Sequence, residues 1–225
     1  MGDADIKSRW LNNEKAVELN ATLNQKNGMT SNITGAIYAT RDSLSLTFDA
    51  NHANVAFMKP YMAAFTSDVQ GEVSGKAVLF GNFKTINLDG DVKADNLKFK
   101  LDYTNVYYSC KGDSVHMRPN LITFGNVRIY DREGHQGKLN GWIKHDCFHD
   151  PVFNFSITDA KELLCYDTNA SINPIWYGQV YGNGSAFVTG EPGVVDIKVN
   201  MQSARNSRFT FVLSDAEEAS EYNFI

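Results

Sequence analysis

The residue types best suited to metal chemistry gather in one short segment, His145-Asp-Cys147-Phe-His149. On a strand, alternate side chains share a face, and imidazole and thiolate are the ligands that Zn²⁺ prefers. A closed zinc site needs a fourth ligand, and no CxxC pair or partner motif supplies one. We therefore interpret the segment as a strand end followed by a turn at Asp150-Pro151, and we expect no metal and no cofactor.

Motifs for catalysis are also missing from the sequence. It contains no GxSxG, HExxH or GxxxxGK[ST] pattern, and the glycine-rich stretch 178–193 has no strand–turn–helix context for holding a phosphate. A carboxylate pair for glycoside hydrolysis stays open, because such pairs meet in space rather than in sequence. We expect a protein that is not an enzyme.

We interpret its three cysteines, Cys110, Cys147 and Cys165, as structural side chains.

Aromatic residues offer a different kind of chemistry, because a planar set of rings can stack on sugars. An alternative function is therefore a carbohydrate-binding β-sandwich of the cell surface. The simpler interpretation is that amphipathic rings line the rims of a sheet. The aromatic residues in question are Tyr103, Tyr107, Tyr108, Tyr130, Tyr166, Trp176, Tyr177 and Tyr181.

Composition narrows the class of protein that must position these residues. The chain has 225 residues, a net charge of −5 and a hydrophobic fraction of 43%. These values argue against a nucleic-acid binder and against a disordered chain. No apolar run approaches the ~18 residues that span a bilayer, and the start MGDADIKSRW has no signal-peptide pattern. We expect either a cytosolic protein or a piece of a longer one.

Apolar and polar residues alternate along most of the chain, which is typical of strands with one buried and one hydrated face. The segments 17–23, 43–48, 97–103, 153–157, 195–201 and 209–213 show this pattern. It favours antiparallel pairing, and turn signals such as Asp89-Gly90, Lys111-Gly112-Asp113 and Asn183-Gly184 separate the candidate strands. Recurring glycines suggest degenerate repeats of strand pairs.

The sequence therefore predicts one all-β unit over 1–225, built as an elongated antiparallel sheet, with a β-sandwich as the alternative. One amphipathic helix is expected near 54–68, where Val55, Met58, Met62 and Phe65 recur at helical spacing. The residues expected on the apolar inner face are Leu97, Phe99, Leu101, Phe153, Phe155, Val195, Ile197, Val199, Phe209 and Phe211.

From about Ser43 to the end, the chain resembles the C-terminal region of the translocation and assembly module TamB family, in its Bacteroidetes form. The resemblance depends on the order and spacing of several short motifs rather than on any single one. They are 54–62, 67–75, 79–83, 88–103, 126–131, 134–141, 177–184, 188–190 and the terminal Tyr222-Asn-Phe-Ile225.

The resemblance implies an extended, strongly curved, trough-like sheet with an apolar inside, in the periplasm of a Gram-negative bacterium. Members of the family are anchored in the inner membrane by one N-terminal helix. The implied partners are phospholipid acyl chains on their way to the outer membrane, and an outer-membrane β-barrel assembly protein. This chain departs from the family in lacking the anchor helix, so we expect it to be a fragment of a larger envelope protein.

Overall fold

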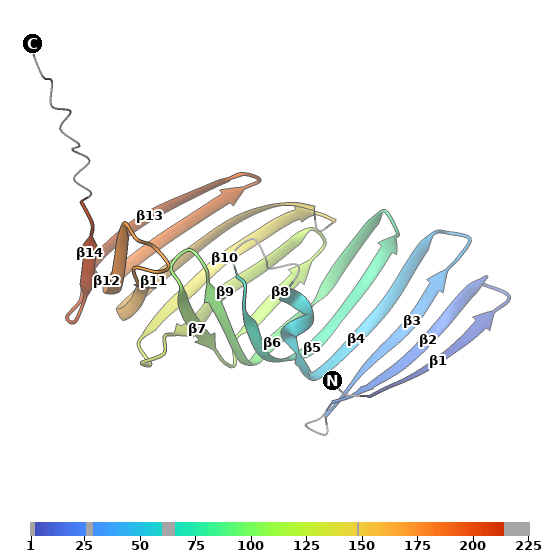
Figure 1. The fold of residues 1–225 in the computed structure, drawn as a ribbon. Helices are drawn as coiled ribbons and strands as arrows, with labels where there is room; N and C mark the ends of the chain where they lie inside the picture. Colours follow the sequence, from blue (N-terminus) through green and yellow to red (C-terminus); the bar gives the residue numbers. More distant parts are fainter. Residues whose placement is uncertain (1–2, 26–28, 60–65, 148, 214–225) are drawn as a thin grey trace, which may run out of the picture.

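A computed structural model describes residues 3–25, 29–59, 66–147 and 149–213. They form one 14-stranded antiparallel sheet with almost no helix. The predicted all-β, elongated fold is confirmed, and the β-sandwich alternative is wrong, because the described strands belong to one sheet rather than two. Figure 1 shows the strands succeeding one another along the length of the molecule, from β1 at one end to β13 and β14 at the other.

The strands are mostly long, and their order in the sheet largely follows their order in the chain. The exceptions are β8, which pairs with β6 and β9, and β14, which pairs with β12. Their bounds are β1 Asp3–Leu11, β2 Ala16–Asn24, β3 Thr30–Tyr38, β4 Ser43–Asn54, β5 Val69–Asn82, β6 Thr85–Leu101, β7 Val106–Cys110, β8 Ser114–Arg118, β9 Leu121–Tyr130, β10 Gln136–Asp146, β11 His149–Thr168, β12 Trp176–Glu191, β13 Val194–Ser203 and β14 Arg208–Phe211.

The expected helix over 54–68 is only partly described. Asn54 ends β4 and caps a short 3₁₀ turn, η1 (Val55–Met58), by accepting a hydrogen bond from the Ala56 backbone N–H. Residues 60–65 lie outside the described part of the chain, and Thr66 is already non-helical. Among the described residues, 55–59 are helical, so a short helix is present near the predicted place, but the predicted bounds 54–68 are too wide at both ends.

Two predicted turns lie inside strands. Asp89-Gly90 is in the middle of β6, and Asn183-Gly184 is in the middle of β12. Gly90 packs so closely on β5 that an added Cβ would fall 2.5 Å from the Ala77 Cα. Glycine is required here by the close approach of a neighbouring strand rather than by a turn.

The most deeply buried part of the molecule lies between β6, β7, β9, β10 and β11. Val106, Ile129 and Leu163 are almost completely buried there, and Tyr108 packs among them. β11 extends beyond its last residue paired with β10, Lys161, and this part of β11 contacts β7. There the Tyr108 hydroxyl donates a hydrogen bond to the Leu164 carbonyl over 2.8 Å. Burial raises the pKa of Tyr108 well above its usual value.

No helix in the described residues is long and apolar enough to cross a membrane.

Candidate functional site: the apolar face of the sheet

The pairing register decides which side chains share a face, because directly opposed residues in an antiparallel sheet point to the same side. Starting at β1 and moving from partner to partner, the register connects one residue of each strand up to β13, with β7 omitted. We call this set the central row. Its members are Ile6, Ala21, Ile33, Phe48, Ala77, Gly90, Met117, Ile122, Ile143, Phe153, Gly190 and Val195.

Every member of the central row is apolar or glycine. At a strand spacing of ~4.8 Å, the row extends over roughly 50 Å. Two further rows run beside it on the same face. The second row is Ala50, Gly75, Val92, Val115, Phe124, Gly141, Phe155, Val188 and Ile197; the third is Val127, Leu139, Ile157, Ala186 and Val199. Together the three rows define a continuous apolar face.

Aromatic rings on this face lie against glycines of the neighbouring strand. The Phe155 ring packs 5.6 Å, centroid to centroid, from both Phe124 and Phe153. An added Cβ at Gly141 would meet the Phe155 ring at 2.5 Å and the Asn154 carbonyl oxygen at 2.3 Å. The recurring glycines therefore make room for large side chains that lie flat across the sheet.

The opposite face is mostly polar and carries cross-strand ion pairs. Asp49, Lys76, Asp91 and His116 are paired in succession across β4, β5, β6 and β8. Lys76 lies 3.0 Å from Asp49, and His116 lies 2.5 Å from Asp91. The His116 hydrogen bond, aided by the charge of Arg118, lowers the pKa of Asp91. These charges thus lie on the side of the sheet opposite the three apolar rows.

The structure places the sequence-predicted residues as follows. Leu97, Phe99 and Leu101 are half-buried on β6 and pair with Cys110, Tyr108 and Val106 of β7. Phe153 and Phe155 are half-buried in the central and second rows. Lys98, Lys100 and Lys198 alternate with these apolar positions and so point to the other face.

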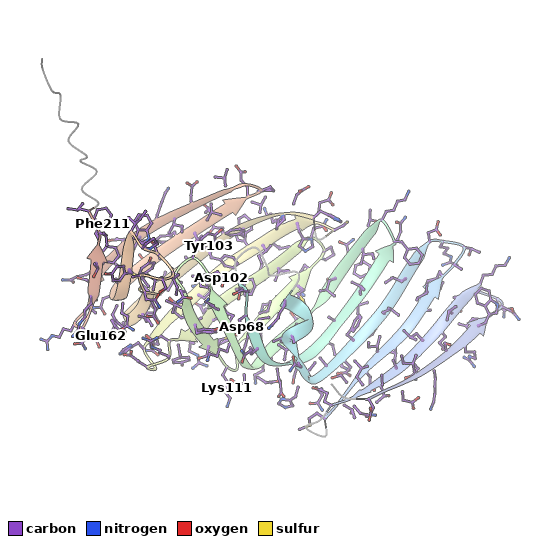
Figure 2. All side chains as sticks on the ribbon, in the orientation of Figure 1. Asp68, Asp102, Tyr103, Lys111, Glu162 and Phe211 are labelled. Carbon is purple, nitrogen blue, oxygen red and sulfur yellow. The ribbon has the colours of Figure 1, made fainter. Side chains whose placement is uncertain are left out.

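The remaining predicted residues share the apolar face but are exposed rather than interior. Ile197 and Val199 on β13 are 53% and 65% exposed, and Val195 is 37% exposed. Phe209 and Phe211 of β14, the latter labelled at the far end of the sheet in Figure 2, are 56% and 53% exposed. Among the described strands, β13 and β14 pair only with β12, so the described residues cover their side chains less than those in the middle of the sheet.

A buried carboxylate, Asp131, joins the turn between β9 and β10 to β11. The sequence analysis did not single it out. The Asp131 side chain has no exposed surface. Its oxygens accept hydrogen bonds from the backbone N–H groups of Glu133 (2.9 Å), His135 (3.0 Å) and Leu164 (2.8 Å). Asp131 thereby ties the β9–β10 turn to β11. An Asp at the start of a turn was the only signal for this role, and it does not reveal the distant Leu164.

The candidate metal ligands do not form a zinc site. His145 belongs to β10, whereas Cys147 lies in the turn before β11 with a positive φ of 48°. The Cys147 backbone N–H donates to the Asn120 side chain, and burial lowers the pKa of His145. Asp150 and Pro151 lie within β11, so the turn precedes them. In the described residues, no group of three or more His, Cys, Asp or Glu side chains could hold a metal ion.

The suggested aromatic residues are divided between the two faces of the sheet. Trp176 and Tyr177 are neighbours in β12 and therefore point to opposite faces. Tyr108 and Tyr181 are buried, and the Tyr181 hydroxyl donates to Glu133 over 2.5 Å. Tyr166 and Trp176 share one face of the sheet: the Tyr166 hydroxyl donates to the Trp176 carbonyl over 3.3 Å, and the Tyr166 ring lies 6.2 Å, centroid to centroid, from Phe209. Binding of a carbohydrate at these rings stays a prediction.

One polar pocket, of about 280 Å³, lies beside β4, β5 and β6. His52 Nδ1 is 3.2 Å from Asp95 and 3.3 Å from Glu72, and Lys93 and Lys111 also line the pocket. The two acids of the pocket, Asp95 and Glu72, both face His52. We place the candidate site on the apolar face instead, because its rows extend over most strands of the sheet. Comparisons with protein-family models, curated proteins and solved structures find no match.

Proposed function

We propose that this chain is a non-enzymatic module of a TamB-like periplasmic protein, and that its apolar sheet face binds phospholipid acyl chains for transport to the outer membrane. The same proposal includes a contribution to the assembly of outer-membrane proteins, with an outer-membrane β-barrel assembly protein as partner. The observation that carries the proposal is the central row, which is apolar or glycine at every position from β1 to β13.

Among the described residues, no second layer of strands or helices covers the sheet, and this supports the proposed function. Apart from η1 against β5 and β7 against β11, the principal contacts in the described chain join strands that are paired within the sheet. A folded protein that leaves a large apolar surface uncovered commonly uses it for binding. Acyl chains are suitable occupants, since each buried methylene contributes ~0.8 kcal/mol.

The chemistry of the face favours movement of a ligand over fixed recognition. Hydrophobic contact is non-directional, so an acyl chain can move between equivalent positions along the rows without losing a specific bond. Side chains of the central row offer no hydrogen-bond donor or acceptor. A lipid headgroup would stay in water, outside the apolar strip, because burying it unpaired costs free energy.

Native mass spectrometry of the purified protein tests the proposal by detecting co-purified phospholipid. The informative variant is Val199→Asp, because Val199 is 65% exposed and its replacement is expected to leave the fold intact, which circular dichroism checks. A charge there adds a desolvation penalty to acyl-chain binding, and we expect bound phospholipid to fall several-fold. The matched control is Asn200→Asp, on the other face of β13, which keeps wild-type occupancy. Equal occupancy in both variants would contradict the proposal.

A further inference from the structure

Two large aromatic rings lie on the polar face of the sheet, opposite the apolar rows. Phe187 of β12 is 44% exposed, and Trp142 of β10 is half-buried. Both strands pair with a described strand on each side, so this exposure does not come from an unpaired strand edge. Aromatic side chains are enriched at the surfaces through which proteins bind. The two rings are therefore a candidate binding site, which the sequence analysis did not single out.

The pairing register places two polar residues of β11 between these rings. Trp142 lies opposite Asn154, and Phe187 lies opposite Ser156, two residues further along β11. Thr189 of β12 lies opposite Asn154 on its other side. Directly opposed residues point to the same side of a sheet, so all five share the polar face. We call these five residues the aromatic patch.

The polar members of the aromatic patch have hydrogen-bonding groups to spare. The Asn154 amide can donate and accept, and so can the hydroxyls of Ser156 and Thr189. Their side chains make no hydrogen bond to another residue in the part of the chain that the structure describes. The patch thus combines two apolar ring surfaces with uncharged hydrogen-bonding groups between them.

The charges around the aromatic patch balance one another. On the same face, two lysines and two acids surround it, and all four are exposed: Lys144, Glu191, Asp196 and Lys198. The Lys144 Nζ lies 4.9 Å from the centre of the Trp142 ring. A surface with equal numbers of positive and negative groups gives no net attraction to an anion or a cation. It favours an uncharged ligand.

We propose that the aromatic patch binds an uncharged glycan chain of β-1,4-linked pyranose units. A pyranose places its C–H groups against an aromatic ring, while its hydroxyls bond to amide and hydroxyl groups at the side of the ring. β10 and β12 are two strand spacings apart, about 10 Å, so one chain must be extended to contact both rings. A β-1,4 linkage keeps such a chain straight, as the flat face of a sheet requires. This site does not depend on what the opposite, apolar face binds.

Isothermal titration calorimetry of the 225-residue chain with cellohexaose and with chitohexaose tests the proposal. These two sugars share the β-1,4 linkage and differ in the substituent at the 2-position. Binding of either one supports the proposal and identifies that substituent. Maltohexaose has the composition of cellohexaose but a curved, α-linked chain, and it should bind at least tenfold more weakly. Failure of both β-linked sugars to bind, or equal binding of maltohexaose, would overturn the proposal.

Substitutions on the two faces of this question separate stacking from adventitious binding. Phe187→Ala and Trp142→Ala should each weaken binding of the β-linked sugar at least tenfold. Phe83→Ala is the matched control, because Phe83 is 47% exposed in the turn between β5 and β6, outside the aromatic patch. Circular dichroism checks that each variant folds, and the exposed position of Phe187 keeps the test available if Trp142→Ala does not. Wild-type affinity in folded Phe187→Ala, or an equal loss in Phe83→Ala, would contradict binding at the patch.

Discussion

The Phe153 ring lies directly over Gly190 of the neighbouring strand, so that a Cβ added to Gly190 would fall 2.2 Å from the ring. The two residues are paired in the register of β11 and β12 and belong to the central row. Glycine at this position lets a large ring lie flat on the sheet. The row is therefore shaped by pairs of a large and a small residue rather than by apolar character alone.

The first prediction follows from this pair. Gly190→Ala should displace the Phe153 ring and lower the free energy of unfolding by about 1–3 kcal/mol, the usual cost of overpacking. Urea denaturation followed by circular dichroism measures this change. Gly125→Ala is the control, because nothing lies within 4 Å of a Cβ added there. An equal change in stability for both variants would contradict the packing role of Gly190.

The second prediction concerns the buried carboxylate of Asp131. Asp131→Ala removes the acceptor for the buried Leu164 N–H, and an unsatisfied buried donor costs about 1–3 kcal/mol. The loss should appear as a lower midpoint in thermal unfolding. Asp196→Ala, on the exposed β13, should change stability by no more than about 0.5 kcal/mol. If the two variants have the same midpoint of thermal unfolding, Asp131 does not connect the turn to β11.

The third prediction concerns the order in which the thiols react. Burial raises the pKa of both Cys110 and Cys165 to about 11. A raised thiol pKa means less thiolate, so at about pH 8 only roughly a thousandth of each is reactive. Cys147 lies in the turn between β10 and β11, where its pKa is also raised, but its sulfur is less buried.

A thiol-reactive chromogenic disulfide should therefore label Cys147 first, and Cys110 and Cys165 only after denaturation. As the pH rises towards 11, labelling of the two buried thiols in the folded protein should accelerate. Peptide mapping by mass spectrometry identifies the labelled position. Rapid labelling of Cys110 at about pH 8 in the native protein would show that the core between β7 and β9 is open.

The alternation of polar and apolar residues was sufficient to predict the fold class and several strands. Segments 17–23, 43–48 and 195–201 lie inside β2, β4 and β13. The prediction extended too far at Tyr103, because β6 ends at Leu101 and a turn follows. Periodicity reports which face a residue occupies, but the residue that ends a strand depends on pairing with other strands.

Long-range features were not readable from the sequence. Gly90 and Gly184 follow Asp and Asn, a local signal for a turn, yet close contact with a neighbouring strand places both inside strands. Asp159 and Glu162 have positive φ values of 52° and 50° at irregularities in β11 that shift its register against β12. The exposure of Ile197 depends on β13 having only β12 as a partner among the described strands, which no local pattern reveals.

The apolar face of the sheet is the central claim, and the native tryptophans report on it. Trp176, in β12, lies on the apolar face, since it shares its alternation with Gly184 and Ala186. Trp142, in β10, pairs with Thr123 and Asn154 on the opposite face. The sequence has 3 tryptophans, and replacing two of them by Phe isolates one reporter at a time.

The most direct measurement is therefore the quenching of tryptophan fluorescence by a phospholipid with brominated acyl chains. The variant that keeps only Trp176 should be strongly quenched, because acyl chains bind on its side of the sheet. The variant that keeps only Trp142 should retain its fluorescence at the same lipid concentration. Equal quenching of both reporters, or quenching of Trp142 alone, would contradict acyl-chain binding at the apolar face.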